Sequence, residues 1–158
     1  MKSRPLLMQH QRIESLIDAV TELPSDKIEM QAHWARYLCV LAAGFLENAL
    51  SDVYSAYAKA RSHPSITNFV EATLLRIQNP KASRFVETAR AFEPNWTEEL
   101  QKFLEQEGRK DAIDAIMSNR HLIAHGKDSG ISLARVKEYL KKSVEVIEFI
   151  EQQCQPNG

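Results

Sequence analysis

The chain has 158 residues, of which 44% are hydrophobic, with only 5 Gly and 6 Pro. This length is enough for one compact domain with a real core and too short for two ordinary domains, so we expect a single domain over residues 1–158. The formal net charge of -1 and the pI near 6.5 exclude the basic surface of a non-specific nucleic-acid coat protein, but they leave room for a local basic cleft.

No apolar run in the sequence is long enough to cross a membrane, and residues 1–5 lead into a charged helix instead of a secretory apolar segment. We therefore expect a cytoplasmic protein that has no membrane partner. Cys39 and Cys154 lie far apart, which predicts neither a disulfide framework nor a thiolate metal site. Cys39 falls in an apolar run and is expected to be a small buried residue.

Helical spacing of apolar residues recurs along the chain, and strand signals are almost absent, so the fold class predicted is an all-α helical bundle. Pro24 ends the first helix, and Ser25 is predicted to cap a long second helix that forms the spine. Asn79 and Pro80 are predicted as the cap and first turn of the fourth helix, and Ser132 as the cap of the last. The predicted helices span residues 9–22, 26–62, 66–78, 81–92, 97–108, 109–125 and 133–153.

The short polar helices of residues 66–108 are predicted to form an insertion between the spine and the helix of residues 109–125. Such connecting segments often carry specificity or regulation. Within the first of these helices, Phe69, Val70, Leu74 and Ile77 occur at helical spacing as its apolar positions.

The most informative residues lie at the end of the helix of residues 109–125. Ile116 and Met117 belong to its apolar face, and Arg120 falls on the same face. A guanidinium stays charged and is costly to bury, so Arg120 predicts a carboxylate, an anion or a water-filled cleft beside it. His125 follows, directly before Gly126, which favours the left-handed conformation that ends a helix. The pattern indicates a site where regular helical geometry stops.

Three interpretations of this pattern are open. The first is chance, because ten Arg and five His in 158 residues produce a given Arg-to-His spacing about 0.3 times by accident. The second is a metal pair of His121 and His125, one helical turn apart, although Leu122 stands where a metalloprotease helix needs a glutamate. The third is a nucleolytic site without metal, in which histidine transfers protons and Arg120 holds a phosphate.

The third interpretation favours a second copy of the chain. Arg120 and His125 point about 140° apart on a regular helix, so they converge only at its frayed end. Two such helix ends meeting across a two-fold axis would double the positive charge and supply one histidine for each proton transfer.

Residues 118–126, Ser-Asn-Arg-His-Leu-Ile-Ala-His-Gly, resemble the Arg-x4–6-His motif of the HEPN superfamily (higher eukaryotes and prokaryotes nucleotide-binding). Residues 36–47 in the spine resemble its RiboL-PSP-type subgroup, and the resemblance extends over nearly the whole chain. It implies a helical bundle and a metal-independent endoribonuclease. It also implies a homodimer in which two motifs form one cleft, with Arg120 contacting the scissile phosphate of RNA and His125 transferring protons.

The resemblance further implies products that end in a 2′,3′-cyclic phosphate, and a role in toxin–antitoxin systems or antiviral defence, with an antitoxin or regulatory partner. It implies no cofactor and no metal ligand. The chain departs from the motif in one respect: many members carry Asn directly after the arginine, where this chain has His121. The supporting polar role then passes to His121, or the activity is reduced.

Further supporting candidates surround the catalytic pair. Ser118 and Asn119 precede Arg120, and Glu47 ends the apolar run of the spine. A carboxylate at Glu47 would fix Arg120 and lower the cost of holding its charge partly buried, whereas the alternative is that Glu47 faces solvent or forms a local pair.

A function of another class competes with the nuclease. The same bundle could act as a catalytically silent module that holds a nucleotide phosphate or RNA at Arg120, or as a subunit that binds a protein partner. RNA cleavage by the wild-type protein separates the two hypotheses.

Overall fold

The computed structural model describes residues 1–24 and 26–155, and this part of the chain contains seven helices and no strand. The all-α prediction is therefore confirmed. No helix among the described residues combines the length and the apolar character needed to cross a membrane. The helices are α1 (Arg4–Thr21), α2 (Ile28–Arg61), α3 (Pro64–Leu74), α4 (Ala82–Phe92), α5 (Trp96–Glu105), α6 (Arg109–Ala124) and α7 (Leu133–Gln153).

Most helix boundaries match the sequence prediction, and α7 matches at both ends. Its predicted cap is confirmed, because the Ser132 side chain accepts the backbone N–H of Arg135 at 3.2 Å. α1 begins five residues earlier than predicted, since Pro5 fits the first turn of a helix, where no intrahelical N–H bond is lost, and Leu6 is buried. The predicted cap Ser25 lies outside the described residues, and α2 begins at Ile28.

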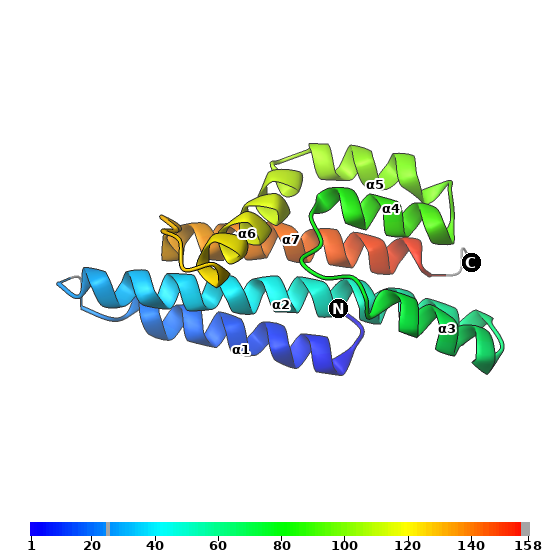
Figure 1. The fold of residues 1–158 in the computed structure, drawn as a ribbon, viewed down its shortest axis with the longest axis horizontal. Helices are drawn as coiled ribbons and strands as arrows, with labels where there is room; N and C mark the ends of the chain where they lie inside the picture. Colours follow the sequence, from blue (N-terminus) through cyan, green and yellow to red (C-terminus); the bar gives the residue numbers. More distant parts are fainter. Residues whose placement is uncertain (25, 156–158) are drawn as a thin grey trace.

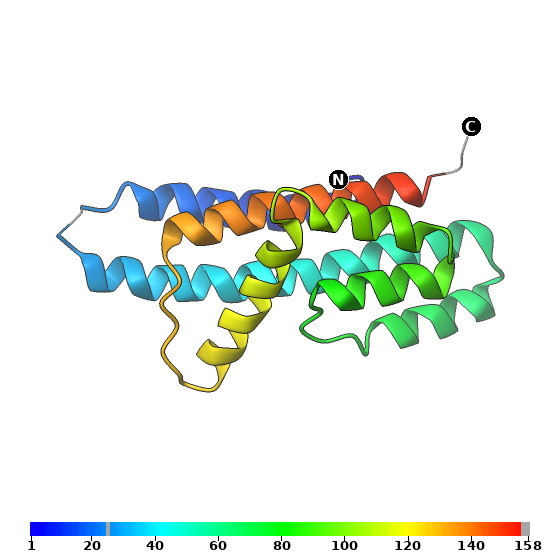
Figure 2. The ribbon, with the colours of Figure 1, turned by 90° about the horizontal axis from the view of Figure 1, so that it is seen from above.

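The longest helices run along the molecule, and α6 crosses them. Figure 1 shows α1, α2 and α7 aligned with the long axis, with α6 lying obliquely against α2 and α7. In the view of Figure 2, the last turns of α6 project beyond α2. The crossing therefore carries the end of α6, with the predicted site, away from the centre of the bundle.

The core lies where α2 meets α1, α6 and α7. Its central residues are apolar side chains that lose all contact with water, each of which contributes roughly 1.5–3 kcal/mol on burial. The largest of these side chains are Tyr54, Phe45, Phe85, Leu38, Leu46, Leu50, Ile113 and Ile116.

Three short helices, α3, α4 and α5, occupy residues 64–105. The predicted cap at Asn79 is wrong: α4 begins after Lys81, and Asp114 of α6 accepts the N–H of Ala82 at 2.8 Å. This bond ties the start of α4 to α6. Phe69 is 73% exposed, whereas Leu74 of the same helix is buried in the core. The interpretation of this region as an insertion stays a prediction.

Candidate functional site

The end of α6 has the geometry that the His-Gly pair predicts. His125 is the C-cap residue, and Gly126 adopts the left-handed conformation with φ of 65°. The N–H of Gly126 bonds to the carbonyl of Ile123 at 3.1 Å, and the N–H of Lys127 bonds to that of Leu122 at 2.9 Å. This pair of bonds forms a Schellman motif, which needs a residue that tolerates positive φ at its turning point. Gly126 therefore fixes the place where α6 stops and His125 is presented.

Arg120 lies at the edge of the core, one turn before the end of α6. Ile116 and Met117 of the preceding turn are buried as predicted, but Arg120 is only half-buried, so it does not occupy the core position that its spacing indicates. Its side chain forms no hydrogen bond or ion pair with residues 1–24 or 26–155. A guanidinium offers five N–H donors and no acceptor, so Arg120 presents an unsatisfied cation at the surface.

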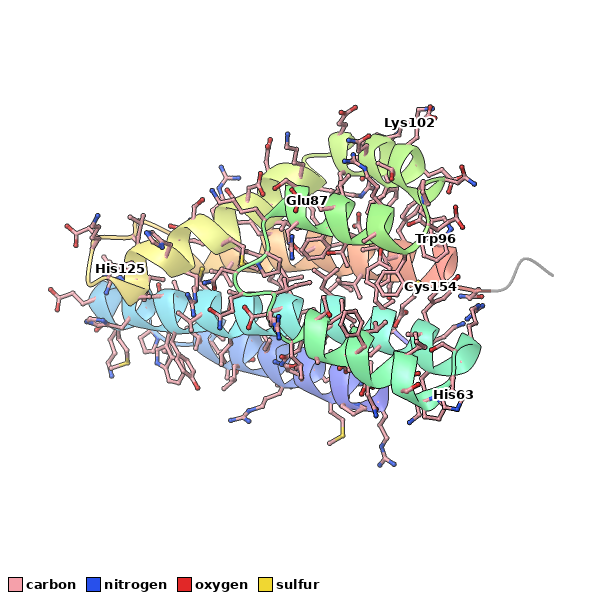
Figure 3. All side chains as sticks on the ribbon, turned by 45° about the vertical axis from the view of Figure 1, so that its right-hand side comes forward. His63, Glu87, Trp96, Lys102, His125 and Cys154 are labelled. Atoms are coloured by element: carbon pink, nitrogen blue, oxygen red, sulfur yellow. The ribbon has the colours of Figure 1, made fainter. Side chains whose placement is uncertain are left out.

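Two imidazole rings lie at the same end of α6 as Arg120. His121 and His125 are exposed, and their ring centres lie 4.4 Å apart with the planes tilted by 57°. Figure 3 shows His125 at an exposed end of the molecule, above the first half of α2. Ser118, which was predicted as a supporting residue, is exposed and makes no side-chain bond within the described chain.

Asn119 is held by bonds on both sides of its amide. Its Nδ2 donates to the carbonyl of Ala115 at 2.8 Å, and its Oδ1 accepts the hydroxyl of Ser129 at 2.7 Å. Ser129 is buried in the loop that joins α6 to α7. The Asn119–Ser129 bond therefore fastens the loop that follows His125 back onto α6. Sequence reasoning missed Ser129, because nothing in its local pattern separates it from an ordinary loop serine.

Glu47 lies half-buried on α2 and is occupied elsewhere. Its Oε2 accepts the backbone N–H of Asn79 at 2.7 Å. Asn79 has a positive φ of 49°, which belongs to the turn that leads into α4. Within the described chain, Glu47 and Arg120 form no ion pair. The Glu47 carboxylate instead anchors the loop after α3 through its bond to Asn79.

A different arginine of α6 is the buried one. Arg109 at the start of the helix is 7% exposed, and its guanidinium lies 2.8 Å from Glu145 and 2.9 Å from Glu107. The same group lies over the Phe103 ring at 4.0 Å from its centre. Sequence reasoning missed Arg109, although Ala112 and Ile113 follow it at the spacing of a shared helix face; its carboxylate partner Glu145 lies on α7 and is not indicated by the local pattern.

The two cysteines do not supply a reactive thiolate. The Cys39 Sγ of α2 lies 3.6 Å from the carbonyl of Ile116, and burial raises the pKa of this thiol to about 12. Burial likewise raises the pKa of Cys154 to about 12. Because the thiolate is the nucleophilic form, neither cysteine is activated for attack near neutral pH. The predicted small, buried role of Cys39 is confirmed.

The site therefore combines one free guanidinium with two open imidazoles. Within the described residues, no group of three or more His, Cys, Asp or Glu side chains is gathered to hold a metal ion. An arginine without a partner binds a phosphate or carboxylate through two parallel hydrogen bonds, and an imidazole accepts or donates a proton near neutrality. This set of groups is suited to a phosphodiester.

The all-α bundle and the Arg-x4-His spacing at the end of α6 define a protein of the HEPN class. The model of the family RiboL-PSP-HEPN matches residues 9–155, and the chain belongs to this family. Neither the search of curated proteins nor that of solved structures gives a significant match. HEPN domains are often RNases, so membership is consistent with an RNase or nucleotide-binding role.

Proposed function

We propose that this protein is a metal-independent endoribonuclease that acts as a homodimer with a composite Arg-x4-His cleft. The observation that carries the proposal is the state of Arg120, whose half-buried guanidinium has no partner in the described chain and which shares the end of α6 with the exposed His121 and His125. In a structural role, a partly buried arginine normally finds a carboxylate or carbonyl. Arg120 is thus available to a ligand of opposite charge.

In the proposed reaction, His125 removes the proton from the 2′-hydroxyl of an RNA nucleotide. The 2′-oxygen then attacks the adjacent phosphorus, the bond from phosphorus to the 5′-oxygen breaks, and a protonated histidine returns a proton to that leaving oxygen. The products are a 2′,3′-cyclic phosphate and a 5′-hydroxyl, and no water is consumed. Arg120 stabilises the extra negative charge on the phosphate in the transition state.

A second copy supplies the second histidine for this scheme. The first half of α2 carries the exposed apolar residues Met30, Tyr37 and Val40, of which Tyr37 is 47% exposed. At 100° per residue, Met30 and Tyr37 lie about 160–180° around α2 from Cys39, which contacts Ile116 of α6, so this surface is on the side of α2 that faces away from α6. Exposed apolar patches are typical of interaction surfaces. These residues support a contact with a second copy of the chain through α2.

The biological setting follows from the proposed chemistry. A nuclease that cuts cellular or invading RNA has to be restrained, which fits a toxin–antitoxin system or antiviral defence. The partners would be RNA as substrate and an antitoxin or another regulatory protein.

The decisive experiment incubates wild type, Arg120→Ala and His125→Ala with a mixed RNA substrate in EDTA and analyses the cut ends. We expect the wild type to leave cyclic phosphates, and each variant to lose at least about 100-fold in rate, the scale of one proton-transfer or charge-stabilising group. His63→Asn is the matched control, because His63 lies at the opposite end of the molecule (Figure 3) and asparagine preserves the helix cap there.

The outcomes separate the hypotheses. Equal activity in wild type and both variants would reject the site, and cleavage only after metal is restored would reject the metal-independent mechanism. If the wild type cuts no RNA but melts at a higher temperature with RNA or a nucleotide, the protein is a binding module.

Sedimentation tests the dimer separately. We expect wild type to sediment as a dimer, and Tyr37→Glu to sediment as a monomer, because it places a charge in the apolar contact. Ala60→Glu is the control, since Ala60 is an exposed residue in the last turn of α2. A monomeric wild type, or a Tyr37→Glu dimer of equal stability, would contradict the proposed interface.

A further inference from the structure

Among the five histidines of the chain, His121 and His125 differ from the other three. His10 lies 3.6 Å from Glu14, and the rings of His33 and His63 bond to Arg36 and Ser65. His121 and His125 have no side-chain hydrogen bond or ion pair in the described chain and contact each other instead, with ring centres 4.4 Å apart. Both rings are open to solvent, so their nitrogens are free to bind a ligand.

We propose that His121 and His125 form a chelating site for a divalent transition-metal ion such as Zn²⁺ or Ni²⁺. Residues four positions apart share one helix face, and neutral imidazole is a preferred ligand of these ions. Around a tetrahedral ion with Zn–N bonds of about 2.0–2.1 Å, two ligand nitrogens lie roughly 3.3 Å apart. The two ring centres are 4.4 Å apart, so the rings are already neighbours before an ion binds.

The backbone that carries both histidines is held in place at the end of α6. His121 lies in the last turn of the helix, and the N–H of His125 still bonds to the carbonyl of His121 at 3.2 Å. The Asn119–Ser129 bond holds the following loop in place. Both histidine backbones are therefore positioned before an ion arrives, which lowers the entropic cost of chelation.

The chelate is exchangeable. No third His, Cys, Asp or Glu of the described chain joins the pair, so water fills the remaining positions around the ion. Structural zinc sites have four protein ligands, and this site has two. The ion is accordingly a reversible ligand and not a part of the folded core.

Bound metal would switch the site off, a consequence that rests on the proposed nuclease function. A coordinated imidazole has donated the lone pair that a general base needs, so His125 cannot take the 2′-hydroxyl proton while the ion is bound. The ion also places positive charge beside Arg120. Metal thus acts as an inhibitor of a reaction that does not require it.

Isothermal titration calorimetry of untagged protein with ZnCl₂, and in parallel with NiCl₂, tests the site itself. We expect saturable binding of one ion per chain by wild type, weakened at least tenfold, or about 1.4 kcal/mol, in His121→Ala and in His125→Ala. His63→Asn is expected to bind as wild type does. Circular dichroism confirms that each variant remains helical. Absence of saturable heat up to about 1 mM metal, or wild-type binding by His121→Ala, would overturn the proposal.

A cleavage assay tests the regulatory consequence. The rate of wild type is expected to fall at a saturating concentration of NiCl₂ and to recover on addition of EDTA. The ratio of rates with and without metal is expected to stay near one for His121→Gln, whatever its rate without metal. An equal fall in both proteins would overturn metal inhibition through the pair. If calorimetry shows the chelate but wild type cuts no RNA, the nuclease function fails while the metal site stands.

Discussion

The two ends of α6 each carry an arginine, and the structure treats them in opposite ways. At the start, Arg109 is buried and bonded to Glu107 and Glu145, with additional bonds to backbone carbonyls. At the end, Arg120 is half-buried and has no partner in the described chain. One helix thus holds both a satisfied and an unsatisfied guanidinium.

The helix dipole sharpens this contrast. The start of a helix carries partial positive charge, so a cation such as Arg109 is unfavourable there without carboxylates to compensate. The end carries partial negative charge, which favours Arg120 but repels a phosphate. An anion at the end of α6 must therefore be held by Arg120 and by protonated imidazole alone. The buried and bonded Arg109 thus helps to hold the fold together, whereas the unpartnered Arg120 indicates the candidate site.

The largest expected effect comes from removing each arginine in turn. Arg109→Ala should lower the free energy of unfolding by about 3 kcal/mol, because the partly buried Glu145 and the backbone carbonyls lose their donor. Arg120→Ala should change it by no more than about 0.5 kcal/mol, since no protein bond is broken. Urea denaturation measures both. Equal losses of stability in the two variants would show that Arg120 has a structural partner after all.

A second variant gives Arg120 a carboxylate neighbour, as Arg109 already has. Ala124 is exposed and four residues after Arg120, so Ala124→Glu places a carboxylate within reach of the guanidinium. We expect RNA cleavage to fall at least about tenfold, because the carboxylate occupies Arg120 and repels phosphate. The isosteric Ala124→Gln serves as the uncharged control. If both variants cut RNA at the same rate, the free state of Arg120 is irrelevant to activity.

The same two arginines show what the sequence allows one to predict. Apolar periodicity places α6 and α7 correctly, and the His-Gly pair locates the end of α6, because these signals are local. Arg120 falls on the apolar stripe and was expected in the core, but the stripe runs out at the point where α6 extends past α2 (Figure 2). Crossing angles are not encoded in local spacing.

Hydrogen bonds between side chains and residues far apart in sequence were also not predicted. Glu47 was proposed as the partner of Arg120, but its carboxylate bonds to Asn79, which the chain brings to α2 only through the turn after α3. Ser129 and Glu145 likewise find their partners across a loop and between helices. Each of these side chains had several possible partners in sequence, and the packing of the helices selects one.

The Asn119–Ser129 bond offers a smaller test at the open end. Ser129→Ala removes a buried hydroxyl and leaves Oδ1 of Asn119 without its donor, so stability should fall by about 1 kcal/mol. At temperatures where the variant is fully folded, this loss of stability leaves the amount of folded protein unchanged. We still expect the cleavage rate to fall there, because the loop behind His125 is released. Ser83→Ala is the control, since Ser83 on α4 is exposed and makes no side-chain bond within the described chain. Matching behaviour of the two serine variants would remove the loop from the site.

A pH-dependent effect concerns the closed middle of α6, where Cys39 meets Ile116. The pKa of Cys39 rises from 9.0 to about 12 on folding, so above pH 9 the unfolded chain loses a proton that the folded chain keeps. Stability from this thiol is fully present below pH 9 and is lost as the pH rises toward 12, by up to about 1.4 kcal/mol per pH unit. Cys39→Ala should therefore show a shallower fall of unfolding free energy between pH 9 and 11 than wild type. Cys154 keeps part of the slope in both proteins, because burial raises its pKa in the same direction. Identical slopes would mean that water reaches Cys39, and that the middle of α6 is as open as its end.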